Sequence, residues 1–263
     1  MKRRILSLLA IALTFALAWL AYTLWPDEDL NWSLTSLFLL LLGLGLFYLR
    51  YERAKVDSKE IAVIASLAAV AIIGRLIFAP FPNFKPTSYF IILSGYAFGP
   101  RAGFMVGATT ALISNLFFGQ GPWTPWQMAA WGLMGAASGW WGRMRKGKAR
   151  PWELAVFGAV WGFLFGWIMN TWSWLTTSYA LSIDTWLATN VTSLWFDASH
   201  ALSNILFALL LTRSCLPILQ RFRNKLNVTK LEVLPDEKTN ADRRAGTADD
   251  AGPARPDRNG GTV

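Results

Sequence analysis

The chain alternates between long apolar runs and short polar segments. One apolar run extends from Ile5 to about Trp25, and a second extends from about Trp32 to Leu49. Six further apolar segments lie at about 60–79, 86–99, 102–119, 126–143, 152–175 and 193–215. Runs near 20 residues match a hydrocarbon core about 30 Å thick, at about 1.5 Å of helix rise per residue. The pattern predicts an all-α integral membrane protein with eight helices, although 86–99 is short for a full span.

The polar segments divide the chain into three regions. Residues 1–57 are expected to form two N-terminal transmembrane helices, and 58–225 a six-helix membrane domain. Ala16-Leu17-Ala18 resembles a signal-peptide cleavage site, but the apolar stretch is too long for a signal core and continues past it, which favours a retained helix. Residues 226–263 are polar and of mixed charge, so they are predicted to form a disordered cytoplasmic tail.

Basic residues fall on one side of the predicted helices. Arg50 to Lys59, Arg143 to Arg150 and Arg213 to Lys225 lie in alternate connections. The other side carries Asp27 to Asp29, Lys85 and Asp184, and no basic residue between 119 and 126. Cytoplasmic loops of membrane proteins carry an excess of Lys and Arg. This asymmetry places both termini in the cytoplasm and residues 120–126 outside.

The composition narrows the function classes further. The net charge of +9 is distributed in short clusters between apolar runs, which is typical of cytoplasmic loops and argues against nucleic-acid binding. The single Cys215 excludes an intrachain disulfide and a cysteine-based metal cluster. Gly142 to Lys148 fits the start of a phosphate-binding loop, but Ala149 stands where Ser or Thr would hold Mg²⁺ and no strand precedes it. Any ATP use must therefore come from another chain, and no cofactor is expected.

Glycines recur at helix-packing intervals. Gly95, Gly99, Gly103 and Gly107 are four residues apart, and Gly158, Gly162 and Gly166 repeat the spacing. Small residues at this spacing let helix backbones approach closely where lipid supplies no hydrophobic drive. These glycines predict a compact helix bundle and indicate no catalytic or binding function.

Asp197 and His200 lie at i and i+3 on one predicted helix face, with Asn204 one turn further. They fit a hydrogen-bonded intramembrane pair that fixes helix packing. They equally fit a ligand or ion path, because buried ionisable groups in membranes are expensive and tend to be functional. A catalytic acid–base pair is the third interpretation and the least favoured, since it needs a nucleophile or a metal.

Amides, prolines and tryptophans gather at the outer end, above all in "GQGPWTPWQMAAWGLMG" at 119–135. An interfacial aromatic belt explains part of the tryptophans. A belt does not require amides and prolines beside it, whereas a small-molecule pocket uses aromatic walls with a few convergent polar groups. Lys85 and Arg75 near this face are candidates to attract an anionic group, although Arg75 also fits a side chain that snorkels to the interface.

Two stretches carry a family resemblance: "FPNFKPTSYFIILSGYAFGPRAGFMVG" and "NLFFGQGPWTPWQMAAWGLMG". Over about residues 58–224 the chain resembles the substrate-binding S component of energy-coupling factor (ECF) vitamin transporters, with the cobalamin-associated branch closest. The resemblance implies a vitamin-like substrate, with cobalamin or a precursor favoured, bound on the extracellular side. It also implies a membrane coupling subunit and two ATPase subunits as partners. The two extra N-terminal helices and the polar tail depart from the family's six-helix pattern.

The resemblance also implies a docking face on the first helix of the six-helix domain. The family carries an alanine-x-x-x-alanine pattern there, which Ala65 and Ala69 fit. The expected substrate-binding residues are Asn83, Lys85, Trp123, Trp126, Gln127, Asn170, Trp174, Asp197 and His200.

Three functions remain open on this sequence. A solute-binding transporter subunit without its own ATPase is favoured. The alternatives are an intramembrane enzyme built on Asp197 and His200, and a structural or signalling membrane protein without a ligand.

Overall fold

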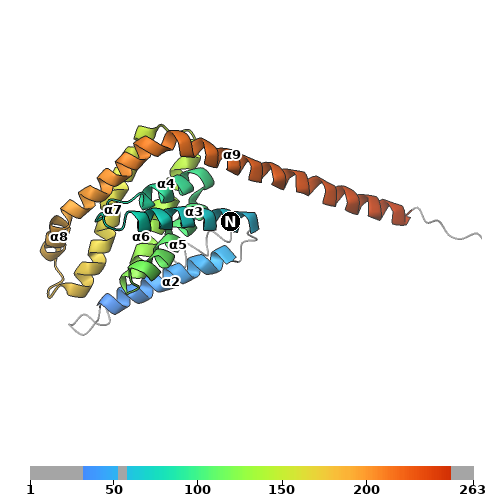
Figure 1. The fold of residues 1–263 in the computed structure, drawn as a ribbon. Coiled ribbons are helices and arrows are strands. Elements are labelled where there is room, and N and C mark those ends of the chain that lie inside the picture. Colours follow the sequence, from blue (N-terminus) through green and yellow to red (C-terminus); the bar gives the residue numbers. More distant parts are fainter. Residues whose placement is uncertain (1–31, 53–57, 250–263) are drawn as a thin grey trace, which may run out of the picture. The chain divides into compact units, whose positions relative to one another are not determined.

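The computed structural model describes residues 32–52 and 58–249, and their regular structure is helical throughout. The helices are α2 (Trp32–Glu52), α3 (Ser58–Ile77), α4 (Thr87–Phe98), α5 (Pro100–Phe118), α6 (Trp123–Met144), α7 (Pro151–Thr177), α8 (Ile183–Thr192) and α9 (Leu194–Asp249) (Figure 1). The all-α fold class is confirmed. The helix expected at 5–25 lies outside the described residues.

One helix near the end of the chain differs from the sequence-based expectation, and the last helix extends past its apolar segment. The ten residues of α8 were expected to be a connection, because they are polar and too few to span a bilayer. The backbone of α9 continues to Asp249, beyond Leu226, where a disordered tail was expected to begin. Residues 1–220 and 221–263 form separate units, so the second part of α9 belongs to the second unit. The final segment, 250–263, is not among the described residues.

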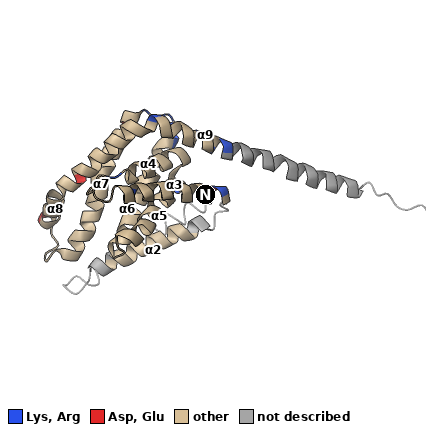
Figure 2. Ribbon diagram, in the orientation of Figure 1, with Lys and Arg blue, Asp and Glu red and all other residues tan. Residues whose placement is uncertain are grey.

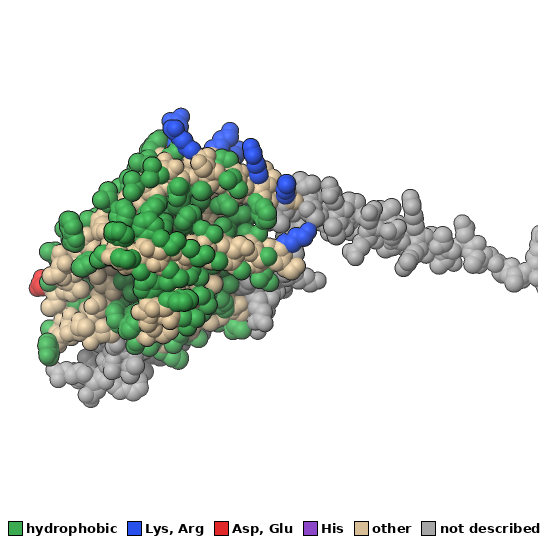
Figure 3. All heavy atoms as spheres, in the orientation of Figure 1, with side chains coloured by type: hydrophobic (Ala, Val, Ile, Leu, Met, Phe, Trp, Pro, Cys, Tyr) green, Lys and Arg blue, Asp and Glu red, His purple; other side chains and the backbone are tan. Residues whose placement is uncertain are grey.

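The described helices differ in how well they suit a bilayer. Three are long and apolar enough to cross one: Ser58–Ile77, Pro151–Thr177 and Leu194–Lys225. Helices α5 and α6 are more polar and glycine-rich, and both bury many residues inside the bundle. The face in Figure 3 is largely apolar, as a lipid-exposed surface requires.

Glycines bring α4, α5 and α6 into backbone contact. A methyl group built on Gly135 of α6 would overlap the carbonyl of Gly103 on α5, and one built on Gly95 of α4 would overlap the carbonyl of Gly135. A side chain larger than hydrogen therefore cannot fit at this crossing without moving a backbone. Tyr96, Met134 and Val106 are fully buried around it and complete the core.

The crossing of α4, α5 and α6 places the ends of the helices in two groups, one at each end of the bundle. One contains the end of α3, the α5–α6 turn, α8 and the start of α9; we call it the site end. The other contains Gly99, the 145–150 loop and the stretch of α9 near Gln220, whose side-chain amide donates to the Gly147 carbonyl oxygen at 2.6 Å. Figure 2 shows basic residues around the α6–α7 connection and at the start of α3, and acidic residues on α8 and at the start of α9.

The helix crossing predicts a sharp dependence on glycine. Gly135→Ala should lower the stability of the purified chain by about 1–3 kcal/mol or prevent folding, because a methyl group overpacks the contact with α5. Gly45→Ala on α2 is the matched control, since nothing lies within 4 Å of the added carbon. Thermal unfolding and elution profiles in detergent measure both variants. Equal stability of Gly135→Ala and wild type would contradict the close crossing.

Candidate functional site

Arg75 is the centre of the polar contacts at the site end. It lies in the last turn of α3, and its Nη1 donates to Ser114 Oγ and, at 2.7 Å, to Asn115 Oδ1 on α5. The guanidinium carbon also lies 4.5 Å from the ring centre of Phe118 and 4.9 Å from that of Trp131. Arg75 therefore joins α3 to α5 and α6 through hydrogen bonds and cation–π contacts.

Asn115 extends these contacts to the first turns of α6. Its Nδ2 donates to Thr124 Oγ1 at 3.0 Å and to Gln127 Oε1 at 2.8 Å. The Thr124 hydroxyl donates in turn to Gln120 Oε1 at 2.9 Å. We call Arg75, Ser114, Asn115, Thr124 and Gln127 the Arg75 network. It fixes the segment 120–127 through side chains, which explains why a loop with two prolines carries amides.

Lys85 is a second cation that contacts the Phe118 ring. Its Nζ lies 4.8 Å from the centre of Phe118. Burial, together with the charge of Arg75, lowers the pKa of Lys85 below its ordinary value. Neither Lys85 nor Arg75 forms an ion pair with any described carboxylate. Two like charges thus share one aromatic ring, and this part of the chain supplies no counter-charge.

The 78–86 connection that carries Lys85 is fastened to α9. Ser203 Oγ donates to the Lys85 carbonyl oxygen at 2.8 Å, and Ser199 Oγ to that of Pro82 at 3.1 Å. Asn83 adopts a positive φ of 54°, a conformation asparagine tolerates, and its Nδ2 donates to the Phe196 carbonyl oxygen at 3.3 Å. Asn83 is exposed and its amide holds the loop in place.

A buried hydrogen-bond chain links α6, α4 and α9. Trp131 Nε1 donates to Ser88 Oγ at 3.0 Å, and that oxygen lies 2.7 Å from His200 Nε2. Because Ser88 accepts from the indole, its own proton is free to be donated to the imidazole. Phe165 of α7 packs against both Trp131 and His200, with ring centres 5.2 and 5.0 Å away.

Asp197 and Asn170 belong to a separate cluster between α7, α8 and α9. Asn170 Nδ2 donates to Asn190 Oδ1 at 3.1 Å and to Ser193 Oγ at 2.6 Å, and Ser193 Oγ donates to Asp197 Oδ2 at 3.1 Å. Gly166 gives the carboxylate room, because an added methyl group there would overlap it. This cluster holds the short α8 against its neighbours.

The tryptophans of the site end have different environments. Trp123 packs edge-on against Trp172 with ring centres 5.8 Å apart, and Trp174 Nε1 donates to Thr185 Oγ1 at 2.8 Å. Trp126 differs, because its indole nitrogen is buried and has no hydrogen-bond partner among the described residues. A buried N–H without an acceptor is costly, so Trp126 is the tryptophan most in need of an external partner.

Ser88 and His200 meet the distance of a nucleophile–base pair, but their surroundings oppose that role. Such a pair needs a third group to orient the base. Asp197 is hydrogen-bonded to Ser193, and no hydrogen bond joins it to His200 within the described residues. Both Ser88 and His200 are buried, at 1% and 7% exposed. The contact fits a link between helices better than a catalytic centre.

The expected site residues thus fall into distinct groups. Gln127 and Lys85 lie in or beside the Arg75 network, His200 lies on the Trp131–Ser88 chain, and Asn170 and Asp197 hold α8. The expected substrate-binding residues did not include Arg75, Asn115, Ser88 or Trp131, although Arg75 was a candidate to attract an anionic group. Arg75 had a signal, as the sole charge in the last turns of an apolar helix, but that pattern also fits a snorkelling side chain.

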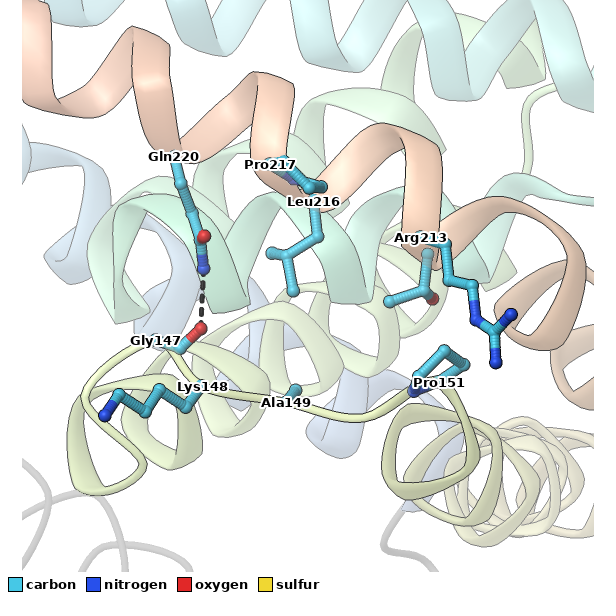
Figure 4. Close-up of a pocket in the computed structure, with 9 residues that line it drawn as sticks. Gly147, Lys148, Ala149, Pro151, Arg213, Leu216, Pro217 and Gln220 are labelled. Carbon is cyan, nitrogen blue, oxygen red and sulfur yellow. Dashed lines mark hydrogen bonds between the residues drawn. The ribbon is translucent and has the colours of Figure 1, made fainter.

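A cavity of about 260 Å³ lies away from the site end (Figure 4). It is bounded by Gly147 to Pro151 on one side and by Thr212 to Gln220 of α9 on the other. It contains none of the expected substrate-binding residues. No group of three or more His, Cys, Asp or Glu side chains suited to a metal ion occurs within the described part of the chain.

Comparison with known proteins gives two matches. The family model for the ECF-type riboflavin transporter S component matches residues 55–216. A UPF0397 protein of Vibrio atlanticus (strain LGP32) is 33% identical over 105 residues, which cover 38% of this chain and 57% of the relative. The chain therefore spans little more than half the length of that curated relative. No solved structure matches the chain.

The Ser88 contacts predict an unequal effect of two serine substitutions on α4. Ser88→Ala should cost about 1–3 kcal/mol of stability, because it leaves the Trp131 and His200 nitrogens buried without their partner. Ser94→Ala is the matched control, since Ser94 is equally buried but bonds only to Phe90 of its own helix. Thermal unfolding in detergent compares the two. A loss for Ser94→Ala as large as that for Ser88→Ala would contradict a linking role.

Proposed function

Since the chain belongs to the family of ECF-type riboflavin transporter S components, we propose that it captures a vitamin-like small molecule at the site end. The observation that carries this proposal is the Arg75 network and its aromatic surroundings. The Arg75 guanidinium and the Asn115 and Gln127 amides are hydrogen-bonded in series, and the rings of Phe118 and Trp131 lie beside the guanidinium. Aromatic walls with few polar groups are typical of small-molecule sites.

Family membership bears on two of the functions left open by the sequence. S components are transport subunits and not enzymes, which confirms the expectation of a transporter subunit and sets aside an enzyme built on Asp197 and His200. The proposed partners are a membrane coupling subunit and ATPase subunits, because this chain carries no complete phosphate-binding loop.

The identity of the vitamin is the finer part of the proposal. The name of the matching family supports riboflavin, whereas the cobalamin expected from the two sequence stretches receives no support from it. Riboflavin is therefore the first candidate, and cobalamin or a precursor the second. The partly buried amide of Gln127 suits either substrate, since riboflavin and cobalamin both carry amide groups that exchange hydrogen bonds.

We propose that the site end faces the outside of the cell. The opposite end carries the 145–150 loop with its basic residues, and such loops are retained in the cytoplasm. The multi-pass membrane location follows from the family and from the long apolar helices. Both termini are then cytoplasmic, as the loop charges predict.

We further propose that Ala65 and Ala69 form the docking face for the coupling subunit. Both are exposed on α3, while Ala68 between them is buried against the core. Among the described residues nothing covers this row, so a flat small-residue surface is available to another helix. Residues 58–225 would then form the substrate-binding domain, with the docking face and the site on the same helix.

The proposed site predicts the effect of tryptophan substitutions on substrate binding. Trp126→Phe should weaken vitamin binding about five- to tenfold if the indole N–H donates to the substrate, and Trp126→Ala about tenfold to a thousandfold. Trp140→Phe and Trp140→Ala are matched controls on α6, where Trp140 is 67% exposed. Calorimetry with riboflavin and cyanocobalamin on the purified full chain measures the affinities. Identical affinities in all variants would remove Trp126 from the site, and no binding of any vitamin would reject the function.

The second prediction concerns orientation. Gln120→Cys in a Cys215→Ala background should react with a membrane-impermeant thiol reagent in intact cells, because the exposed Gln120 would face outward. Lys146→Cys at the opposite end should react only after permeabilisation. The reverse pattern would invert the topology.

The third prediction concerns docking. Replacing Ala65 and Ala69 with Leu should abolish co-purification with the coupling subunit and leave substrate binding intact, because two bulky side chains prevent close helix approach. Replacing Val156 and Val160 with Leu is the matched control, since this exposed pair has the same spacing on α7. Normal co-purification of the Ala65/Ala69 variant would show that the docking face is elsewhere.

A further inference from the structure

Two positive charges lie on one ring at the site end and have no counter-charge. Arg75 and Lys85 contact Phe118 at 4.5 and 4.8 Å. Neither pairs with a carboxylate in the described part of the chain. The ion pair between Arg145 and Glu153 lies at the opposite end. Asp197 of the site end is hydrogen-bonded to Ser193.

This arrangement is unfavourable as it stands. Like charges repel more strongly where protein and lipid replace water. Burial and, to a smaller extent, the charge of Arg75 lower the pKa of Lys85. Charged groups near a bilayer are retained where they pair with one another or bind a substrate. A bound anion would offset the repulsion between Arg75 and Lys85.

The hydrogen-bonding capacity that remains is on the donor side. Arg75 uses Nη1 for Ser114 and Asn115, and its Nε and Nη2 donate to no described residue. Those two nitrogens form the edge that binds a carboxylate or phosphate with two parallel hydrogen bonds. Lys85 Nζ makes its contact with the Phe118 ring, and Trp126 Nε1 is buried without an acceptor.

We propose that the substrate carries an anionic group, a carboxylate or a phosphate, which Arg75 binds through its Nε–Nη2 edge and Lys85 attracts. Phe118 and Trp131 then contact the uncharged part beside the anion. The inference rests on the proposed function and changes the order of its candidates, because it favours acidic or phosphorylated vitamins, such as flavin mononucleotide, over neutral riboflavin. Arg75 thereby binds the protein through Nη1 and the substrate through Nε and Nη2.

Pairs of similar vitamins, one anionic and one neutral, test the effect of the negative charge of the substrate on binding. The probes are flavin mononucleotide against riboflavin, pantothenate against pantothenol, and nicotinate against nicotinamide, each measured by calorimetry on the purified full chain. Within a pair that binds, the anionic member should bind about tenfold more tightly or better. The flavin pair reports a phosphate, and the other two report a carboxylate.

Variants then assign the effect to the two cations. Arg75→Gln should bring the ratio of the two affinities within a pair, anionic over neutral, close to one. Lys85→Gln should reduce this ratio less. Arg75→Lys keeps the charge but loses the second hydrogen bond, so it should retain part of the ratio. Lys148→Gln is the matched control, because it removes the same charge from an exposed position at the opposite end. If Arg75→Gln does not fold, Lys85→Gln and Arg75→Lys still decide the outcome.

The outcomes separate this inference from the proposed function. If the neutral member of a pair binds as tightly as the anionic one, the substrate class is wrong and the vitamin-binding function stands. If no vitamin binds, the proposed function fails, and thermal unfolding with inorganic phosphate or acetate against chloride, at equal ionic strength, decides the anion site. Stabilisation by phosphate or acetate that disappears in Arg75→Gln supports the site. No stabilisation overturns it.

Discussion

The backbone contact between α4, α5 and α6 is the constraint on which the rest of the structure depends. In a bilayer, apolar side chains gain little by leaving lipid, so helices associate through close packing. Gly95, Gly103 and Gly135 permit that packing because each meets a neighbouring backbone with no side chain between. The three helices can then act as one rigid element, and the end of α5 and the start of α6 are held together at the site end.

The Arg75 network uses this rigidity. Ser114 and Asn115 on α5 and Gln127 on α6 are positioned by the crossing, and Arg75 reaches them from α3. Hydrogen bonds among polar side chains gain strength where water is excluded, and an unpaired group there is correspondingly costly. The network therefore fixes the segment 120–127 and leaves a donor edge of Arg75 open. Rigid placement of donors lowers the ordering cost of binding a ligand.

The two ends of the bundle are suited to different partners. The site end combines aromatic rings, amides and two cations, as a pocket for a small polar molecule requires. The exposed row of Ala65 and Ala69 begins nearer the other end of α3 and offers a surface for another helix. In the proposed function, a single helix would carry both Arg75 at the substrate site and the small residues at the docking face.

The Pro-rich stretch 119–127 shows how much of the site can be predicted from the sequence. Its prolines and amides indicated a fixed polar loop, and the structure shows how it is fixed, through Asn115 and Thr124. Similarly, Asp197 and His200 share a helix face in the sequence, but they bond to Ser193 and Ser88 and belong to different clusters. Spacing along one helix predicts a shared face. It does not predict which neighbouring helix that face meets.

The sequence by itself determined the helical membrane fold, the positions of most helices and the glycine rows, because hydropathy and local spacing encode them directly. The resemblance of two stretches to ECF S components indicated the family, and the cobalamin branch is not supported by the matching family model. The sequence did not determine α8, which is short and polar and is stabilised by contacts with α7 and α9. It also left the role of Arg75 open, since a cation near the end of an apolar helix fits both an interface anchor and a site. Only the tertiary structure shows that the Arg75 guanidinium bonds to α5 within the bundle. Ser114 and Asn115 lie about 40 positions away in the chain, and their contact with Arg75 depends on how α3 packs against α5.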